Sequence, residues 1–228
     1  MKLICPALLA LAAASSHAGR PLATEDAGVL DPRACEVEGA HERERAAGAS
    51  ARVHSLQLAC GVGARTQLAL AASRERDGGS RAEGLRLGGK TRLWPTAADD
   101  EAPAWTLAYA LEAARDGGGS WGRAGHAVQL VHSRPAGESL TLHLNLGHER
   151  GVPARQGRTT LGVAAEHEGV AGWMPMAELY GDDRDAPWWS LGLRWVALPE
   201  RLSFGLAWGR QIASGRPQRT ALSFTFNF

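Results

Sequence analysis

Beyond its first residues, the chain lacks any long hydrophobic run. After residue 18, no stretch approaches the roughly 18 apolar residues that a membrane-spanning helix requires. Hydrophobic residues make up 44% of the 228 positions, and the mean hydropathy is −0.22. Such values argue against a helical membrane protein. They remain compatible with a β-barrel, in which lipid-facing residues alternate with polar ones.

The chain also lacks an excess of charge of one sign. It has 25 Lys and Arg against 24 Asp and Glu, whereas nucleic-acid binding needs a basic patch. We therefore expect no nucleic-acid partner. The histidines show no metal-ligand spacing, and Gly61-Val-Gly63 predicts a turn because no helix-opening pattern follows it. No metal and no cofactor are expected.

The first 18 residues have the features of a secretory signal peptide. Lys2 supplies a positive charge, an apolar run extends from Ile4 to Ala14, and Ser16-His17-Ala18 is a small-x-small cleavage site. We expect residues 1–18 to be removed, and an uncleaved anchor is the alternative. Residues 19–33 would then form a periplasmic or lumenal segment ahead of the folded part, residues 34–228.

Most of the chain alternates between apolar and polar residues with the period of two that indicates β-strands. In residues 140–147, for example, four leucines alternate with Thr141, His143, Asn145 and Gly147. We expect about twelve strands, near residues 34–45, 51–61, 65–75, 82–93, 105–114, 124–133, 140–147, 160–166, 173–180, 189–195, 202–209 and 220–228. Connections of alternating length between them are typical of bacterial barrels. The long stretch 94–104 breaks this alternation and leaves the strand count open by two.

The last nine residues form an aromatic strand. Leu222, Phe224, Phe226 and Phe228 fall on one face, and small or polar residues fall on the other. This pattern resembles the C-terminal signal by which bacterial outer-membrane barrels are recognised for assembly. We therefore predict an all-β protein, a transmembrane antiparallel up-and-down β-barrel in the bacterial outer membrane. Its expected partners are outer-membrane lipid and lipopolysaccharide and the barrel assembly machinery.

Tryptophan outnumbers the other aromatic residues, with eight Trp against four Phe and two Tyr. Trp favours the membrane–water interface because its ring is apolar and its N–H needs a partner. We expect strand ends or adjoining loops to hold Trp105, Trp121, Trp173, Trp188, Trp189, Trp195 and Trp208. Packing beneath loops is the alternative for some of them.

A family resemblance enters after the signal peptide. The stretch from Arg20 to Glu38, which begins Arg-Pro-Leu-Ala-Thr-Glu-Asp-Ala-Gly-Val-Leu, resembles the start of a family of proteobacterial outer-membrane barrels. Met176 to Asp183 with the following Trp188-Trp189 is similar to the same family. Many of its members are described as transporters, some by similarity to proteins linked to phenol degradation. The resemblance implies passage of hydrophobic or aromatic solutes, and it carries over no catalytic residues.

Two cysteines remain after the signal peptide, Cys35 and Cys60. If the first two strands form a hairpin centred near residues 47–48, Cys35 lies opposite Cys60 and Val37 faces Leu58. The periplasm is oxidising, so we predict a cross-strand disulfide. The alternative is a pair of buried free thiols.

The polar strand faces predict a lumen of mixed charge. The candidate lumen-lining residues are Arg86, Lys90, Arg92, Glu112, His143, Glu166, Glu178 and Arg194. Opposite charges in a narrow lumen can pair and close it, or they can line a pore. We also hypothesise that the segment containing Glu25 and Asp26 enters the lumen and meets the basic residues. A disordered periplasmic tail is the alternative.

Catalysis is not expected from these residues. His132 and Ser133 are the pair that a lipid-hydrolysing barrel would use, but neighbours on a strand point to opposite faces. Gly181 to Asp185 predicts a solvated outer loop, with a site for a divalent ion or lipopolysaccharide as the alternative. The sequence thus favours a passive channel for small solutes. A closed structural or surface-interaction barrel is the second interpretation, and a lipid-modifying enzyme is the third.

Overall fold

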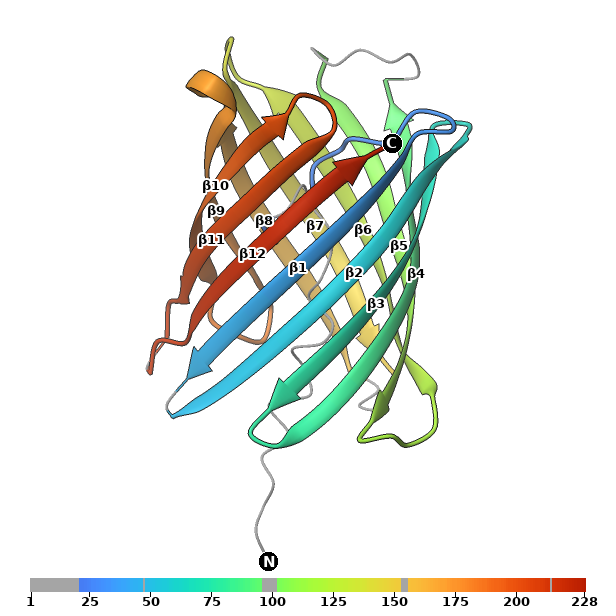
Figure 1. The fold of residues 1–228 in the computed structure, drawn as a ribbon, viewed down its shortest axis with the longest axis vertical. Helices are drawn as coiled ribbons and strands as arrows, with labels where there is room; N and C mark the ends of the chain where they lie inside the picture. The colour runs from blue at the N-terminus through green and yellow to red at the C-terminus, as the bar shows by residue number, and fades with distance from the viewer. Residues whose placement is uncertain (1–20, 47, 96–101, 153–155, 214) are drawn as a thin grey trace, which may run out of the picture.

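The protein is a closed antiparallel barrel of twelve strands in sequence order, with β1 paired to β12. Figure 1 shows this computed structural model, which describes residues 21–46, 48–95, 102–152, 156–213 and 215–228. The strands are β1 (Cys35–Ala46), β2 (Ala49–Gly63), β3 (Thr66–Asp77), β4 (Ser80–Trp94), β5 (Ala104–Asp116), β6 (Gly122–Pro135), β7 (Leu140–Gly151), β8 (Gly157–His167), β9 (Trp173–Asp182), β10 (Trp188–Leu198), β11 (Leu202–Gln211) and β12 (Gln218–Asn227).

The predicted fold class and all twelve predicted strands are confirmed. The strands extend beyond most of the predicted ranges because the alternation continues into charged residues at their ends. The count holds despite the long β4–β5 connection, of which residues 96–101 lie outside the described part. The expected signal peptide, residues 1–18, also lies outside it. Among the described residues, no helix is long and apolar enough to cross a membrane.

The C-terminal strand closes the barrel. It pairs with β1 from Glu36 opposite Asn227 to Arg45 opposite Gln218. Cys35 and Phe228 complete the seam, since the backbone N–H of each donates to the carbonyl oxygen of the other at 2.9 and 2.8 Å. Closure leaves neither β1 nor β12 with an unpaired sheet edge.

The outer face of the barrel is apolar over its middle. Exposed large hydrophobic side chains occur on every strand from β2 to β12, including Leu56, Leu111, Leu161, Leu191 and Leu222. A continuous apolar band of this kind is unfavourable in water and suits contact with lipid. The alternation of residues therefore sorts the side chains into an apolar exterior and a polar lumen.

One of the seven expected interfacial tryptophans points the other way. Trp188 is buried on the lumen side, where its ring stacks with Tyr180 and lies 4.9 Å from the Arg219 guanidinium. Trp189, the next residue, meets Trp208 edge-on at 5.1 Å. The reason is the strand period, which sends two consecutive tryptophans to opposite faces.

The predicted disulfide is present. Cys35 and Cys60 are directly opposite in the β1–β2 ladder and are bonded, with Val37 opposite Leu58 in the same register. The bond ties the two strands at the end of the barrel that holds the C-terminus. This end is called the terminal end below, and the opposite end, where β1 turns into β2, is called the loop end (Figure 1).

Residues 21–34, called the N-terminal segment below, run inside the barrel before β1 begins. Their side chains at Leu22, Thr24, Glu25 and Ala27 are only 4%, 3%, 2% and 1% exposed. At the terminal end, Arg33 donates its backbone N–H to the Gly61 carbonyl, and Gly61 donates to Ala34, both at 2.9 Å. A Cβ atom at position 61 would lie 2.0 Å from the Asp31 carbonyl oxygen. The close approach of these two backbones therefore requires glycine.

Candidate functional site

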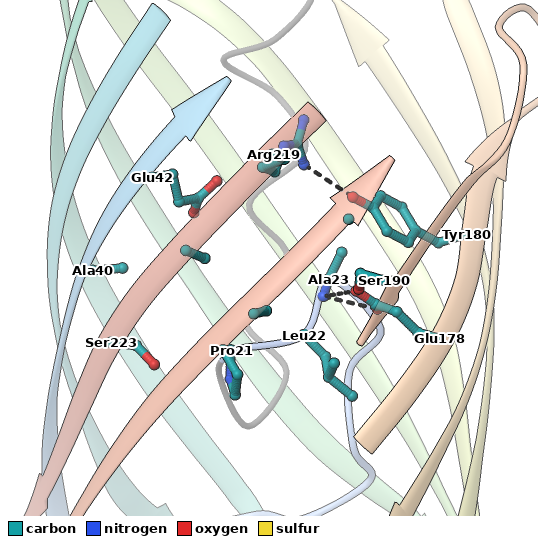
Figure 2. Close-up of a pocket in the computed structure, with 13 residues that line it drawn as sticks. Pro21, Leu22, Ala23, Ala40, Glu42, Glu178, Tyr180, Ser190, Arg219 and Ser223 are labelled. Carbon is teal, nitrogen blue, oxygen red and sulfur yellow. Dashed lines mark hydrogen bonds between the residues drawn. The ribbon is translucent and has the colours of Figure 1, made fainter. Parts of the chain in front are cut away.

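The lumen is the candidate site, and Glu178 of β9 is its most connected carboxylate. Its oxygens accept hydrogen bonds from the backbone N–H groups of Ala23 and Thr24, each with a shortest distance of 2.9 Å. They also accept the Thr24 hydroxyl at 2.9 Å and the hydroxyl of Ser190. Figure 2 shows Ala23 and Ser190 gathered around this side chain. The carboxylate thereby satisfies consecutive backbone donors that the N-terminal segment cannot satisfy itself.

Side chains of β4 and β7 contact the next residues of the segment, Glu25 and Asp26. Lys90 Nζ lies 2.5 Å from the Glu25 carboxylate and donates to the Asp26 carbonyl oxygen at 3.2 Å. Asn145 brackets the Glu25 backbone, accepting its N–H at 2.5 Å and donating to its carbonyl oxygen at 2.8 Å. Both side chains are buried. The segment therefore meets a basic lumen residue through Glu25 and Asp26.

Hydroxyl and amide side chains hold the rest of the segment. Ser133 accepts the Ala27 N–H at 2.8 Å, and Thr106 donates to the Ala27 carbonyl oxygen at 2.7 Å. Gln67 accepts the Leu30 N–H at 2.8 Å. These wall residues come from β3, β5 and β6. Inner-face residues of strands on several sides of the barrel thus replace the sheet partners that the segment lacks.

The other candidate lumen residues include pairs of opposite charge on the wall. Arg86 lies 3.9 Å from Glu112, and Glu166 lies 3.5 Å from Arg194. Arg92 faces Thr106 across the β4–β5 ladder, and its buried Nε has no hydrogen-bond partner among the described residues.

All eight candidate residues lie at inward-facing positions of their strands. Lys90 and Glu178 contact the N-terminal segment directly. His143 acts on it through Ser133, whose hydroxyl accepts the Ala27 N–H. The structure therefore brings part of the predicted set together around the segment and leaves the charge pairs on the wall beside it.

Sequence reasoning missed the pairing of Ser133 with His143. Ser133 Oγ lies 2.7 Å from His143 Nδ1, and His143 Nε2 lies 3.9 Å from Glu166. His132 instead faces outward and stacks on Trp105 with ring centroids 4.2 Å apart. A hydrolytic triad uses the same three residue types, but here Ser133 Oγ is engaged by Ala27 and the histidine is buried. The group holds the segment in place.

Among the described residues, pockets lie on both flanks of the N-terminal segment. One, of about 40 Å³, lies toward Glu42, Tyr180 and Arg219 (Figure 2). Arg219 donates to Tyr180 at 3.3 Å and to Glu44 at 3.0 Å. The other, of about 270 Å³, lies between the segment and the inner wall of β1 to β5, and its polar lining includes Glu36, Glu38 and Arg86. The segment therefore leaves pockets on its flanks and occupies the middle of the lumen.

On β1 and β3 near the loop end, acidic and basic side chains are segregated between the two faces of the barrel. Near the loop end, Glu42 and Glu75 lie in one inner row on either side of Val53, and Glu44 and Asp77 flank Ala51 in the next. The arginines between them in sequence point outward. The sequence signal is Glu-Arg-Glu-Arg at residues 42–45 and Arg-Glu-Arg-Asp at 74–77, in which a period-two strand sends each sign to its own face.

No metal site emerges from these charges. Across the ranges that the structure describes, no group of three or more His, Cys, Asp or Glu residues is placed to hold a metal ion. At the end of β9, Asp182 instead accepts the backbone N–H groups of Arg184 and Asp185 in the loop that follows, both at 2.9 Å.

Comparison with solved structures shows the same fold at low sequence identity. The KdgM porin in complex with disordered oligogalacturonate matches with a TM-score of 0.63 and 10% identity, over 85% of this chain and 99% of that one. An outer membrane channel from Pseudomonas putida F1 matches with a TM-score of 0.64 and 11% identity, over 89% and 98%. The toluene transporter TbuX from Ralstonia pickettii matches with a TM-score of 0.51 and 8% identity, over 87% and 90%.

The sequence comparisons complete the assignment. No curated protein matches the chain. A family model matches residues 7–228, which is nearly the whole chain, and its description is "Uncharacterised conserved protein UCP029691". The chain therefore belongs to the family UCP029691.

Proposed function

We propose that the protein is a channel of the bacterial outer membrane, through which small solutes diffuse when the N-terminal segment leaves the lumen. The observation that carries this proposal is the separation of wall from segment. Each of the twelve strands pairs with two others in a closed ladder, whereas the segment up to Leu30 is held by side chains of the wall. The apolar exterior supports the membrane location.

The energetics favour a gate that opens rarely. Each hydrogen bond between segment and wall contributes about 1 kcal/mol net, and those to charged groups contribute about twice that. These contacts offset the entropy lost when the segment becomes ordered. The open state is therefore a minor population, which a solute or a change in the segment can increase.

The class of solute is inferred from the charges of the lumen, because the fold alone does not determine it. Two structures of similar fold are named for oligogalacturonate and for toluene, which are chemically opposite, and fold does not determine function. The inner rows of Glu42, Glu44, Glu75 and Asp77 favour small cationic or neutral polar solutes over anions. Hydrophobic or aromatic solutes, which the family resemblance implies, are the alternative class.

A disulfide lock tests the gate directly. A Cβ atom built on Gly162 would lie 3.5 Å from Thr24 Cβ, within the separation that a disulfide spans. We propose to produce the chain from Gly19 onward as T24C/G162C and to record single-channel currents in planar bilayers. The oxidised variant should show no openings, and a reductant should restore the openings of the parent chain.

The parent chain and each single variant, treated with the same reductant, control for reduction of Cys35–Cys60 and for each substitution alone. Equal conductance from the oxidised and reduced double variant would overturn the gate. The occluded lumen also favours a second candidate, a permanently closed structural barrel. This second candidate would be established if three proteins show no single-channel current while migrating on a gel as folded barrels. These are the parent, the reduced double variant and a chain lacking residues 21–30.

A further inference from the structure

Four arginines stand side by side on the outer face of β1 to β4. Arg43 is directly opposite Arg52, Arg52 is opposite Arg76, and Arg76 is opposite Arg81. Their inward-facing sequence neighbours are Glu42, Glu44, Glu75 and Asp77 among others, so the outward direction of the arginines follows from the strand period. Residues 43, 52, 76 and 81 are called the arginine row below.

The neighbouring outer row adds to the positive charge. It contains His41, His54, Arg74, Glu83 and Arg115, each opposite the next across β1 to β5. Glu83 is the only acidic residue in the two rows, and it is already engaged by three arginines. The guanidinium group of Arg74 lies 3.1 Å from the Glu83 carboxylate, and Arg115 Nε donates a hydrogen bond to it at 2.7 Å. Arg81 also forms an ion pair with Glu83.

Like charges directly opposite each other on a sheet are destabilising. Arg43 donates to the Ser50 hydroxyl at 3.2 Å, but no carboxylate of the described residues lies within 4.0 Å of the Arg43, Arg52 or Arg76 guanidinium groups. Arg52, Arg76 and Arg81 are exposed. The arginine row therefore lacks enough anions of its own, and an anion from outside the chain would remove the repulsion.

The position of the row indicates which anion. On β2 and β3, Arg52 and Arg76 are followed toward the terminal end by the exposed Leu56 and Leu70 of the apolar band. In Figure 1 strands β1 to β4 lie next to one another, and the β1–β2 and β3–β4 turns are at the loop end, away from the C-terminus. The C-terminal strand, which resembles the outer-membrane assembly signal, ends at the terminal end. We place that end on the periplasmic side, so the row lies at the edge of the outer leaflet.

We propose that the arginine row binds the phosphate groups of lipopolysaccharide in the outer leaflet. Lipid A carries phosphates at the junction of its acyl chains and its sugars, which is where the row borders the apolar band. Guanidinium groups bind phosphate through two parallel hydrogen bonds. The Leu56 and Leu70 side chains beneath would contact the acyl chains. The inference rests on the outer-membrane location proposed above, but it does not depend on an open lumen.

Native mass spectrometry of the refolded barrel in neutral detergent tests the site with purified bisphosphorylated lipid A. The variant R43Q/R52Q/R76Q should bind it roughly a hundred-fold more weakly, since each basic side chain contributes about five-fold. The variant R43K/R52K/R76K, which keeps the charge, should retain most of the binding. A matched control, R65Q/R134Q/R201Q, removes three exposed arginines at the terminal end and should bind as the wild type does.

Folding is checked by heat-modifiable migration without lipid A, where the glutamine variant should be at least as stable as the wild type because repulsion is removed. Three results would overturn the proposal. The first is that dephosphorylated lipid A binds the wild type as tightly as bisphosphorylated lipid A does. The second is that inorganic phosphate at the same concentration binds the wild type as well as lipid A does. The third is that the control variant loses as much lipid A binding as the glutamine variant. Silent bilayers would count against the channel but would leave this result unaffected.

Discussion

At the residue scale, one carboxylate does most to hold the N-terminal segment. Glu178 is buried, and it accepts hydrogen bonds from two consecutive backbone N–H groups and from two hydroxyls. A charged acceptor suits this set of donors, because an amide would offer one oxygen and would turn its own N–H groups toward the others. The position therefore links the lumen wall to the N-terminal segment, the proposed gate.

The substitution Glu178→Gln should release the N-terminal segment. Loss of hydrogen bonds to a buried charge costs about 2–3 kcal/mol, so opening should become roughly 30- to 150-fold more frequent. A Leu22→Cys thiol, normally buried, reports the opening through its rate of labelling by a water-soluble maleimide. Glu112→Gln is the matched control, because Glu112 pairs with Arg86 on the wall. Equal labelling rates in the two variants would show that Glu178 does not hold the segment.

At the element scale, β1 combines three roles in twelve residues. It forms the seam with β12, it carries the disulfide to β2, and it sends Glu42 and Glu44 inward while Arg43 and Arg45 face outward. The disulfide is placed where the strand leaves the N-terminal segment. It therefore fixes the start of β1 at the point where the segment turns into the wall.

Removing the disulfide should lower the stability of the barrel without changing its fold. The bond closes a loop with a sequence separation of 25 residues, for which restriction of the unfolded chain contributes about 3 kcal/mol. We expect Cys35→Ser/Cys60→Ser to unfold at lower urea concentration in lipid vesicles, followed by tryptophan fluorescence. Under reducing conditions the wild type should unfold with the variant. Coincident curves under oxidising conditions would contradict the prediction.

At the scale of the whole molecule, a nearly neutral chain places opposite charges on the two faces of β1 to β4 near the loop end. The near balance of 25 basic and 24 acidic residues hides acidic inner rows and a basic outer row at the loop end. In the proposed channel, the inner rows would act on solutes in the lumen and the outer row on lipopolysaccharide. Net charge alone would have indicated neither property.

The open channel should prefer cations. We expect the variant Glu75→Gln/Asp77→Asn to lower the K⁺/Cl⁻ permeability ratio by roughly two- to ten-fold, because these carboxylates raise the local cation concentration. Reversal potentials in a salt gradient across a neutral bilayer measure the ratio. Arg74→Gln/Arg76→Gln changes the alternate residues of the same strand, which face outward, and should leave the ratio unchanged. An anion-selective parent channel would be inconsistent with this account of the lumen.

Much of the wall could be predicted because its causes are local. Period-two alternation assigns residues such as Thr106 and Tyr109 to opposite faces, and short connections make sequential strands antiparallel neighbours. The pairing of Cys35 with Cys60 follows from the first hairpin alone. Trp188 lies at a strand end as expected, but it faces the lumen, because it precedes the outward-facing Trp189 by one position.

The sequence by itself determined the strands, their faces, their number, the disulfide and the closing strand, since each depends on residues that are near in sequence or on one repeated pattern. The sequence left open whether the segment with Glu25 and Asp26 enters the lumen or forms a disordered tail, and only the tertiary structure decided for the lumen. The contacts of Glu178 with Thr24, of Lys90 with Glu25 and of Ser133 with His143 depend on the curvature of the closed barrel and on the path of a segment that has no repeat. The alternation of residues encodes neither the curvature nor the path of this segment. The contacts between the segment and the wall can therefore be read only from the closed barrel.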